Sequence, residues 1–83
     1  MNASCNRLLE LGWTETETDN TDRRYFDRGH ITATVYKNGQ VYVYIDETTR
    51  LADGYDLDAV LREAKRRLQE TASLYNEALE DLP

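Results

Sequence analysis

The segment from residue 31 to residue 45 alternates between aliphatic residues and threonine or tyrosine. Residues 31–36 are Ile-Thr-Ala-Thr-Val-Tyr, residues 41–45 are Val-Tyr-Val-Tyr-Ile, and Asn38-Gly39 lies between them. A repeat of two places successive side chains on opposite faces of a β-strand, and Asn-Gly is typical of a hairpin turn. The sequence therefore predicts two antiparallel strands joined by a tight connection.

The register of this hairpin decides which side chains share a face. A two-residue Asn-Gly turn would pair Val35 with Tyr42 and mix aliphatic with aromatic residues on each face. A three-residue loop, Lys37-Asn38-Gly39 with a left-handed Gly39, pairs Val35 with Val41 instead. A one-residue slip moves every side chain to the other face, so the cleaner separation favours the three-residue loop. One face is then Ile31, Ala33, Val35, Val41, Val43 and Ile45, and the other is Thr32, Thr34, Tyr36, Tyr42 and Tyr44.

Elements before the hairpin follow from local patterns. Residues 3–11 predict a short helix that Gly12 ends, with Trp13 packing back on it. Residues 13–18 alternate and predict a strand, residues 19–22 a turn, and residues 23–28 a second strand. Gly29-His30 predicts a bend. These elements would form an antiparallel meander of three to four strands.

The chain after the hairpin predicts a polar connection over residues 46–54 and then a long helix capped by Asp56. Apolar residues recur at steps of three and four, which marks one face of a helix that would run to Asp81. We expect this helix to cover the aliphatic face of the sheet. The predicted fold class is α+β, with residues 1–83 forming a single domain.

Composition narrows the function classes. The 16 acidic residues against 10 basic ones give a net charge of −6, which argues against a direct DNA or RNA binder. No apolar run approaches the roughly 20 residues that span a bilayer, and residues 1–5 lack a signal-peptide pattern. A lone Cys5 cannot form an internal disulfide. We expect a cytoplasmic protein with no membrane contact.

Catalytic and metal-binding residue sets are sparse. A nucleophile and base would have to be Cys5 and His30, but Cys5 is expected to be a small buried hydrophobe and His30 a turn residue. A metal site would need His30 with Asp27 or other scattered carboxylates, which is unlike the Cys and His clusters of structural sites. We predict no enzymatic activity, no cofactor and no metal.

Two surface features remain as candidate binding sites. Residues 14–22 carry Glu15, Glu17, Asp19 and Asp22 without a cation, and these acids serve either solubility or recognition of a partner. Arg23 and Arg24 are expected to neutralise acids of the facing strand. Tyr36, Tyr42 and Tyr44 share one sheet face, which would be a binding surface if it is uncovered, since tyrosine is enriched in binding hot spots. Alternatively, the first helix or a second protomer covers it.

An acidic domain with an aromatic face and no catalytic motif resembles, as a class, the small anti-defence proteins of phages and mobile elements, such as anti-CRISPR proteins. Those families share no common motif, so no residue role is carried over. The resemblance implies a non-catalytic inhibitor in the host cytoplasm that binds a bacterial nuclease or surveillance complex, with its carboxylates standing in for DNA phosphates.

Two alternatives stay open. The order α-β-β-β-α is similar to double-stranded-RNA-binding-like folds, including RNA-cleaving toxins of the HicA type. Those toxins carry a Gly-Ser-His motif with a catalytic histidine, whereas Gly29-His30 lacks the serine. The other alternative is a structural homodimer formed through the tyrosine face or the long helix.

Overall fold

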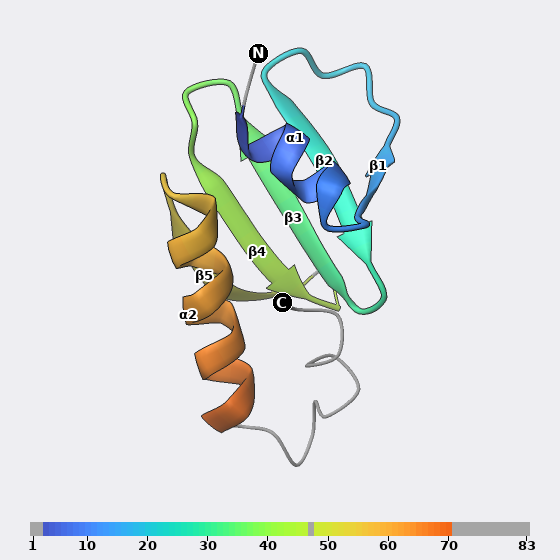
Figure 1. Ribbon diagram of the computed structural model, residues 1–83. Coiled ribbons are helices and arrows are strands. Elements are labelled where there is room, and N and C mark those ends of the chain that lie inside the picture. The colour runs from blue at the N-terminus through green and yellow to red at the C-terminus, as the bar shows by residue number, and fades with distance from the viewer. Residues whose placement is uncertain (1–2, 47, 71–83) are drawn as a thin grey trace.

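The computed structural model describes residues 3–46 and 48–70, which form one antiparallel sheet and two helices (Figure 1). The elements in chain order are α1 (Ala3–Glu10), β1 (Thr14–Thr16), β2 (Arg23–Arg28), β3 (Ile31–Tyr36), β4 (Val41–Ile45), β5 (Thr49–Gly54) and α2 (Leu57–Glu70). Each strand lies beside its neighbours in sequence, in the order β1-β2-β3-β4-β5. The predicted α+β class is confirmed, with a five-stranded sheet where three to four strands were expected.

The β3–β4 hairpin has the predicted register. Val35 pairs with Val41, and Thr34 pairs with Tyr42. The amide of Gly39 donates to the carbonyl of Tyr36 at 2.9 Å, and Gly39 has a φ of +96°. Only glycine adopts such a backbone angle without strain. The three-residue loop with its left-handed glycine is therefore confirmed.

The fifth strand was not predicted, because residues 46–54 were expected to form a polar connection. In the structure β5 pairs with β4, but Val43 lies opposite Ala52 whereas Tyr44 lies opposite Arg50. Leu51 is the extra residue of this bulge, and both Leu51 and Ala52 are buried. A bulge breaks the alternation of a strand, so the repeat of two that would have identified β5 is missing from its sequence.

Helix α1 ends as its sequence predicted. The amide of Gly12 donates to the carbonyl of Leu9 at 3.1 Å, and the amide of Trp13 donates to that of Leu8 at 3.0 Å. This pair of hydrogen bonds, with Gly12 at a φ of +91°, forms a Schellman motif. Trp13 is buried in the same core as Leu8, as expected for the residue that follows such a cap.

Helix α2 begins at a capped end. The carboxylate of Asp56 accepts a hydrogen bond from the amide of Asp58 at 3.2 Å, which confirms the predicted N-cap. The predicted apolar stripe is buried along the described helix, at Leu57, Val60, Leu61, Ala64 and Leu68. Its predicted continuation to Asp81 lies outside the described residues. Neither described helix is long and apolar enough to cross a membrane.

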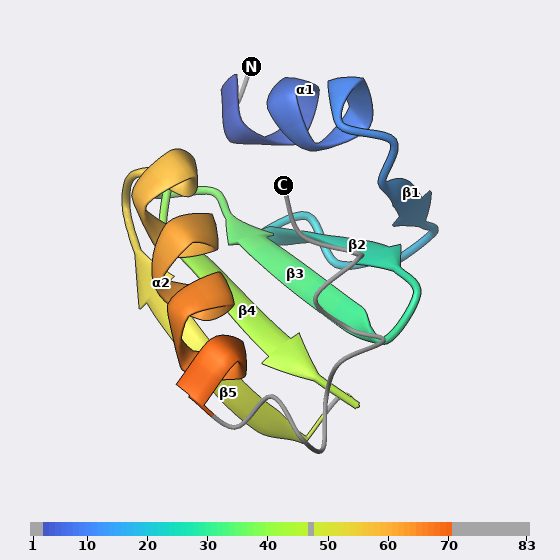
Figure 2. The ribbon, with the colours of Figure 1, turned by 60° about the horizontal axis from the view of Figure 1, so that its bottom comes forward.

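Both helices pack on the same face of the sheet (Figures 1 and 2). Cys5 and Leu8 of α1 share one hydrophobic core with Leu61 and Leu68 of α2. The sheet contributes the predicted aliphatic face together with Phe26 to this core. Because α1 and α2 lie side by side on this face, no helix within the described ranges covers the other face of the sheet.

Candidate functional site

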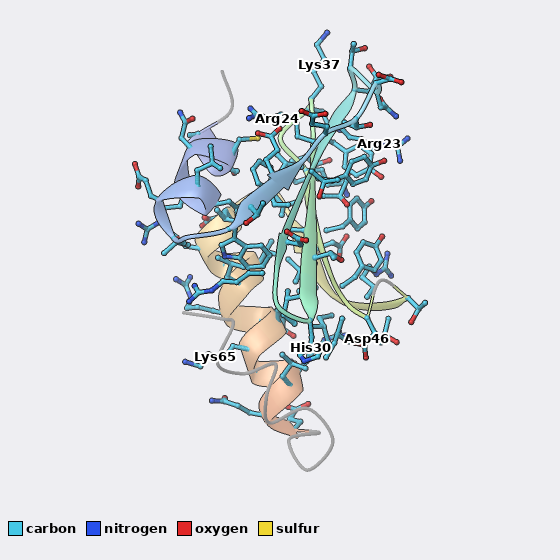
Figure 3. The ribbon with its side chains drawn as sticks, turned by 90° about the vertical axis from the view of Figure 1, so that its right-hand side faces the viewer. Arg23, Arg24, His30, Lys37, Asp46 and Lys65 are labelled. Carbon is cyan, nitrogen blue, oxygen red and sulfur yellow. The ribbon has the colours of Figure 1, made fainter. Side chains whose placement is uncertain are left out.

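The sheet face turned away from both helices is here called the open face. The antiparallel register and the alternation of side chains place on it Thr14, Thr16, Arg23, Tyr25, Asp27, Thr32, Thr34, Tyr36, Tyr42, Tyr44, Arg50 and Asp53. Figure 3 views the sheet on edge, with Arg23 on the open side and Arg24 on the side of the helices. The four tyrosines are half-buried, so each ring keeps part of its surface accessible to solvent.

The structure brings the three sequence-predicted tyrosines into one cluster. The ring centroids of Tyr36 and Tyr42 are 5.3 Å apart with an edge-to-face angle of 73°. Those of Tyr42 and Tyr44 are 6.4 Å apart and nearly parallel, at 23°. Both separations lie in the range in which aromatic rings attract one another. The three rings therefore form a continuous aromatic surface across β3 and β4.

Two arginines extend this cluster at its borders. The guanidinium carbon of Arg23 lies 5.0 Å from the centre of the Tyr36 ring, and its Nη1 donates to the Tyr36 hydroxyl at 3.4 Å. The guanidinium carbon of Arg50 lies 6.0 Å from the centre of the Tyr42 ring. Cations at such distances are attracted to the ring faces. Arg23 was expected to neutralise an acid, whereas its contacts are with Tyr36.

A shallow hollow of about 330 Å³ lies on the open face between Tyr25 and Tyr44. Its lining includes Thr16, Thr32 and Thr34, whose short side chains leave room between the rings. Tyr25 was not among the predicted site residues. The alternation of β2 could have identified it, because Tyr25 lies two residues from Arg23 and pairs with Thr34 of the predicted tyrosine face.

Glu15 lies apart from the other predicted acids. Its carboxylate accepts two hydrogen bonds from Arg24, from Nε and Nη2, both at 2.6 Å. Glu15 pairs with Phe26 across β1 and β2, which places it on the helix side of the sheet. These hydrogen bonds from Arg24 hold the pKa of Glu15 below its usual value. The expected neutralisation by Arg24 is confirmed, and Glu15 is engaged in the fold.

The other three predicted acids, Glu17, Asp19 and Asp22, are exposed in the connection between β1 and β2. Asn20 shapes this loop, since its Oδ1 accepts a hydrogen bond from the amide of Asp22 at 2.8 Å. The carbonyl of Asp22 accepts from the amide of Lys37 at 2.8 Å. This bond joins the end of the acidic loop to the Tyr36 end of the open face, so the two predicted features are contiguous at one corner.

Cys5 and His30 lie on different elements and in different surroundings. Cys5 is fully buried in α1, and burial raises the pKa of its thiol. His30 is exposed in the turn between β2 and β3, with its Nδ1 3.9 Å from Oδ1 of Asp46. Across residues 3–46 and 48–70, no group of three or more His, Cys, Asp or Glu side chains could hold a metal ion.

No family model matches this chain, and neither a curated protein nor a solved structure matches it at a significant level.

Proposed function

We propose that this chain is a non-catalytic protein-binding module that acts as an inhibitor, with the open face as its docking surface. The observation that carries the proposal is the packing of both described helices on one side of the sheet, opposite the tyrosine cluster. Tyrosine and arginine are enriched at protein interfaces, where rigid aromatic rings bury much surface at a small entropic cost. The cluster flanked by Arg23 and Arg50 has this composition.

The proposed target is a nucleic-acid-handling bacterial complex, such as a defence nuclease. The support is electrostatic, because a basic groove built for phosphates attracts any polyanion. The chain carries a net charge of −6, and the loop with Glu17, Asp19 and Asp22 adjoins the Tyr36 end of the open face. Glu15 is bound to Arg24, so the mimicry of phosphates rests on the other three acids.

The chemistry of the two candidate catalytic residues supports a binding role. A reactive cysteine needs a lowered pKa, since the thiolate is the nucleophile. Burial raises the pKa of Cys5, so this residue stays a protonated thiol at neutral pH. His30 is exposed in a turn, and its Nδ1 lies 3.9 Å from Oδ1 of Asp46.

A second candidate function is binding of single-stranded RNA on the same face. Bases stack on exposed aromatic rings, and arginines beside those rings add favourable contacts to the phosphates. Arg23 and Arg50 lie against Tyr36 and Tyr42 in that manner. The net charge of −6 opposes binding of a polyanion, so protein binding is the function that we favour.

The test is capture of targets from a bacterial lysate on the immobilised chain, followed by mass spectrometry. Tyr42→Ala removes the central ring of the cluster, and Tyr55→Ala is a matched control. Tyr55 is 67% exposed and lines a separate hollow beside residues of α1 and α2. We expect wild type and Tyr55→Ala to capture a nucleic-acid-handling protein that double-stranded DNA displaces, and Tyr42→Ala to lose it.

Equal capture by Tyr42→Ala and wild type would show that the open face is not the docking surface. If added DNA does not reduce the capture, the acids do not act as phosphate mimics. The second candidate is measured separately, by fluorescence anisotropy with a labelled single-stranded RNA. Binding of that RNA by wild type and its loss in Tyr42→Ala would favour the RNA-binding function over the inhibitor.

A further inference from the structure

The open face is also chemically complementary to itself. Residues on it lie in rows that cross all five strands. One row is Thr14, Asp27, Thr32, Tyr44 and Arg50, and the next is Thr16, Tyr25, Thr34, Tyr42 and Asp53. Acidic Asp27 and basic Arg50 thus stand on β2 and β5 of one row, and the large Tyr42 and Tyr44 stand beside the small Thr34 and Thr32.

We infer that the free protein forms a twofold-symmetric homodimer through the open face, with the axis parallel to the strands between β3 and β4. This axis turns β3 toward the partner's β4 and β2 toward the partner's β5, and it keeps each row opposite itself. Tyr42 then faces the partner's Thr34, and Tyr44 faces the partner's Thr32. Large side chains facing small ones allow two sheets to interdigitate.

Charges follow the same symmetry. The axis places Asp27 opposite the partner's Arg50, and the hydroxyl of Tyr25 opposite the carboxylate of the partner's Asp53. Each contact occurs twice, because a twofold interface is self-complementary. Packed sheets cross at about 30°, which shifts the outer strands by a few ångströms, within the reach of an arginine. Within the described residues, no ion pair of the monomer engages Asp27, Arg50 or Asp53.

Other placements of the axis lose this complementarity. An axis that crosses the strands along the second row would bring Asp53 against the partner's Asp53, and like charges in contact repel. An axis along β3 would place Asp27 against the partner's Tyr44 and leave Arg50 without an acidic counterpart. The open face carries Arg23 and Arg50 against Asp27 and Asp53, so its charges balance although the chain has a net charge of −6.

The available area indicates a weak dimer. The axis between β3 and β4 stacks β2–β5 on the same four strands of the partner and leaves β1 outside the overlap. Four strands spaced about 4.8 Å apart, with about 3.3 Å per residue along six-residue strands, give an overlap about 19 Å wide and about 20 Å long. Two such faces bury on the order of 800 Å², which is below the size of stable specific interfaces and typical of weak, transient association. The dimer would therefore dissociate readily and release the open face to a target of higher affinity.

The test is sedimentation velocity of the free protein from about 10 µM to about 1 mM, a range in which weak interfaces dissociate. We expect the weight-average mass of wild type to rise from monomer toward dimer. Asp27→Arg and Arg50→Asp should each weaken the association tenfold or more, and the double variant should restore it because the facing charges are exchanged. Arg62→Asp, at an exposed position of α2, makes the same charge change as Arg50→Asp and should not weaken it.

A dilution series of amide NMR spectra provides a second readout. Shifts that depend on concentration should map to β3 and β4 and leave α1 unchanged. A chain that stays monomeric at all concentrations overturns the inference. A dimer that tolerates both single charge reversals, or that the double variant does not restore, overturns it as well. No target is present in these measurements, so their outcome is separate from that of the lysate capture that tests the inhibitor proposal.

Discussion

Glu15 and Arg24 form a two-pronged ion pair between adjacent strands β1 and β2, with both hydrogen bonds at 2.6 Å. This pair attaches the three-residue edge strand to the sheet on the side that carries the helices. Both side chains are about one-third exposed, at 32% and 33%. The pair therefore combines good geometry with partial shielding from water, which makes it a stronger contact than an ordinary surface ion pair.

Replacement of Glu15 by glutamine should lower stability at neutral pH by about 1 kcal/mol, or about 4–8 °C in melting temperature. The folded-state pKa of Glu15 is lowered by Arg24, so its contribution is present above the unfolded-state pKa and is lost as pH falls through the folded-state value. The difference in melting temperature between wild type and Glu15→Gln should therefore shrink on acidification. Glu17→Gln removes the same charge from an exposed site and is the control. A difference that stays constant with pH would contradict this role.

Gly39 should be intolerant of a side chain because of its backbone angle. Its φ is +96°, and the atom nearest to an added Cβ is Cδ1 of Tyr55 at 4.0 Å, so the cost is conformational rather than steric. Gly39→Ala should lose about 1–2 kcal/mol in urea denaturation. Gly39→Asn should lose less, because asparagine tolerates positive φ better. Equal stability of Gly39→Ala and wild type would mean that the loop adopts another conformation.

Truncation of neighbouring residues of β4 should affect different properties, stability in one case and binding in the other. Val43 is fully buried, so Val43→Ala should lose about 2 kcal/mol through lost burial and a cavity. Tyr42→Ala and Tyr44→Ala remove rings from the open face and should shift the melting temperature by only a few degrees, while weakening target binding or self-association by about 2 kcal/mol. Thermal melts and a binding titration separate the two effects. Unfolding of both tyrosine variants would show that this face is buried.

His30→Ala should leave target binding and inhibition unchanged. His30 is in the turn between β2 and β3, whereas the only thiol of the chain, Cys5, is buried in α1 with a raised pKa. Covalent catalysis needs a protein nucleophile that is activated by an adjacent base, and a buried thiol with a raised pKa is not activated. The measurement is an inhibition assay together with an RNA-cleavage assay. Loss of activity in a folded His30→Ala variant would restore the RNA-cleaving alternative.

The acidic loop should govern the rate of association. If Glu17, Asp19 and Asp22 stand in for phosphates, added salt should weaken target binding, because exposed charges are screened beyond about 8 Å at physiological ionic strength. Reversal of two of these charges should slow association more than it accelerates dissociation. Surface plasmon resonance at several salt concentrations measures both rates. If neither salt nor charge reversal changes the association and dissociation rates, the acids of the loop contribute to solubility and not to binding.

Particular residues explain which parts of the fold are readable from sequence. The glycine loop, the helix end at Gly12 and the Asp56 cap were predicted correctly, because each depends on a local rule about backbone angles or orphan amides. Strand β5 was missed because its bulge buries two consecutive residues, Leu51 and Ala52. Packing, which no local rule specifies, decided this element.

The sequence likewise predicted only part of the candidate site. Alternation together with the three-residue loop grouped Tyr36, Tyr42 and Tyr44, since strand register fixes the face. The contacts of Arg23 and Arg50 with the tyrosine rings depend on the direction in which each arginine side chain extends over a neighbouring strand. The sequence does not specify that direction. The separation of Glu15 from the other acids is likewise tertiary, because it follows from the Arg24 side chain on an adjacent strand.

Along β3 and β4, odd-numbered residues fill the interior and even-numbered residues form the open face. Interior and exterior are therefore encoded at alternating codons of the same short stretch of gene. Mutation at the even positions can change the chemistry of the open face and leave the folding intact. Descendants that bind unrelated targets should then keep the aliphatic residues at positions 31, 33, 35, 41, 43 and 45 while positions 32, 34, 36, 42 and 44 diverge.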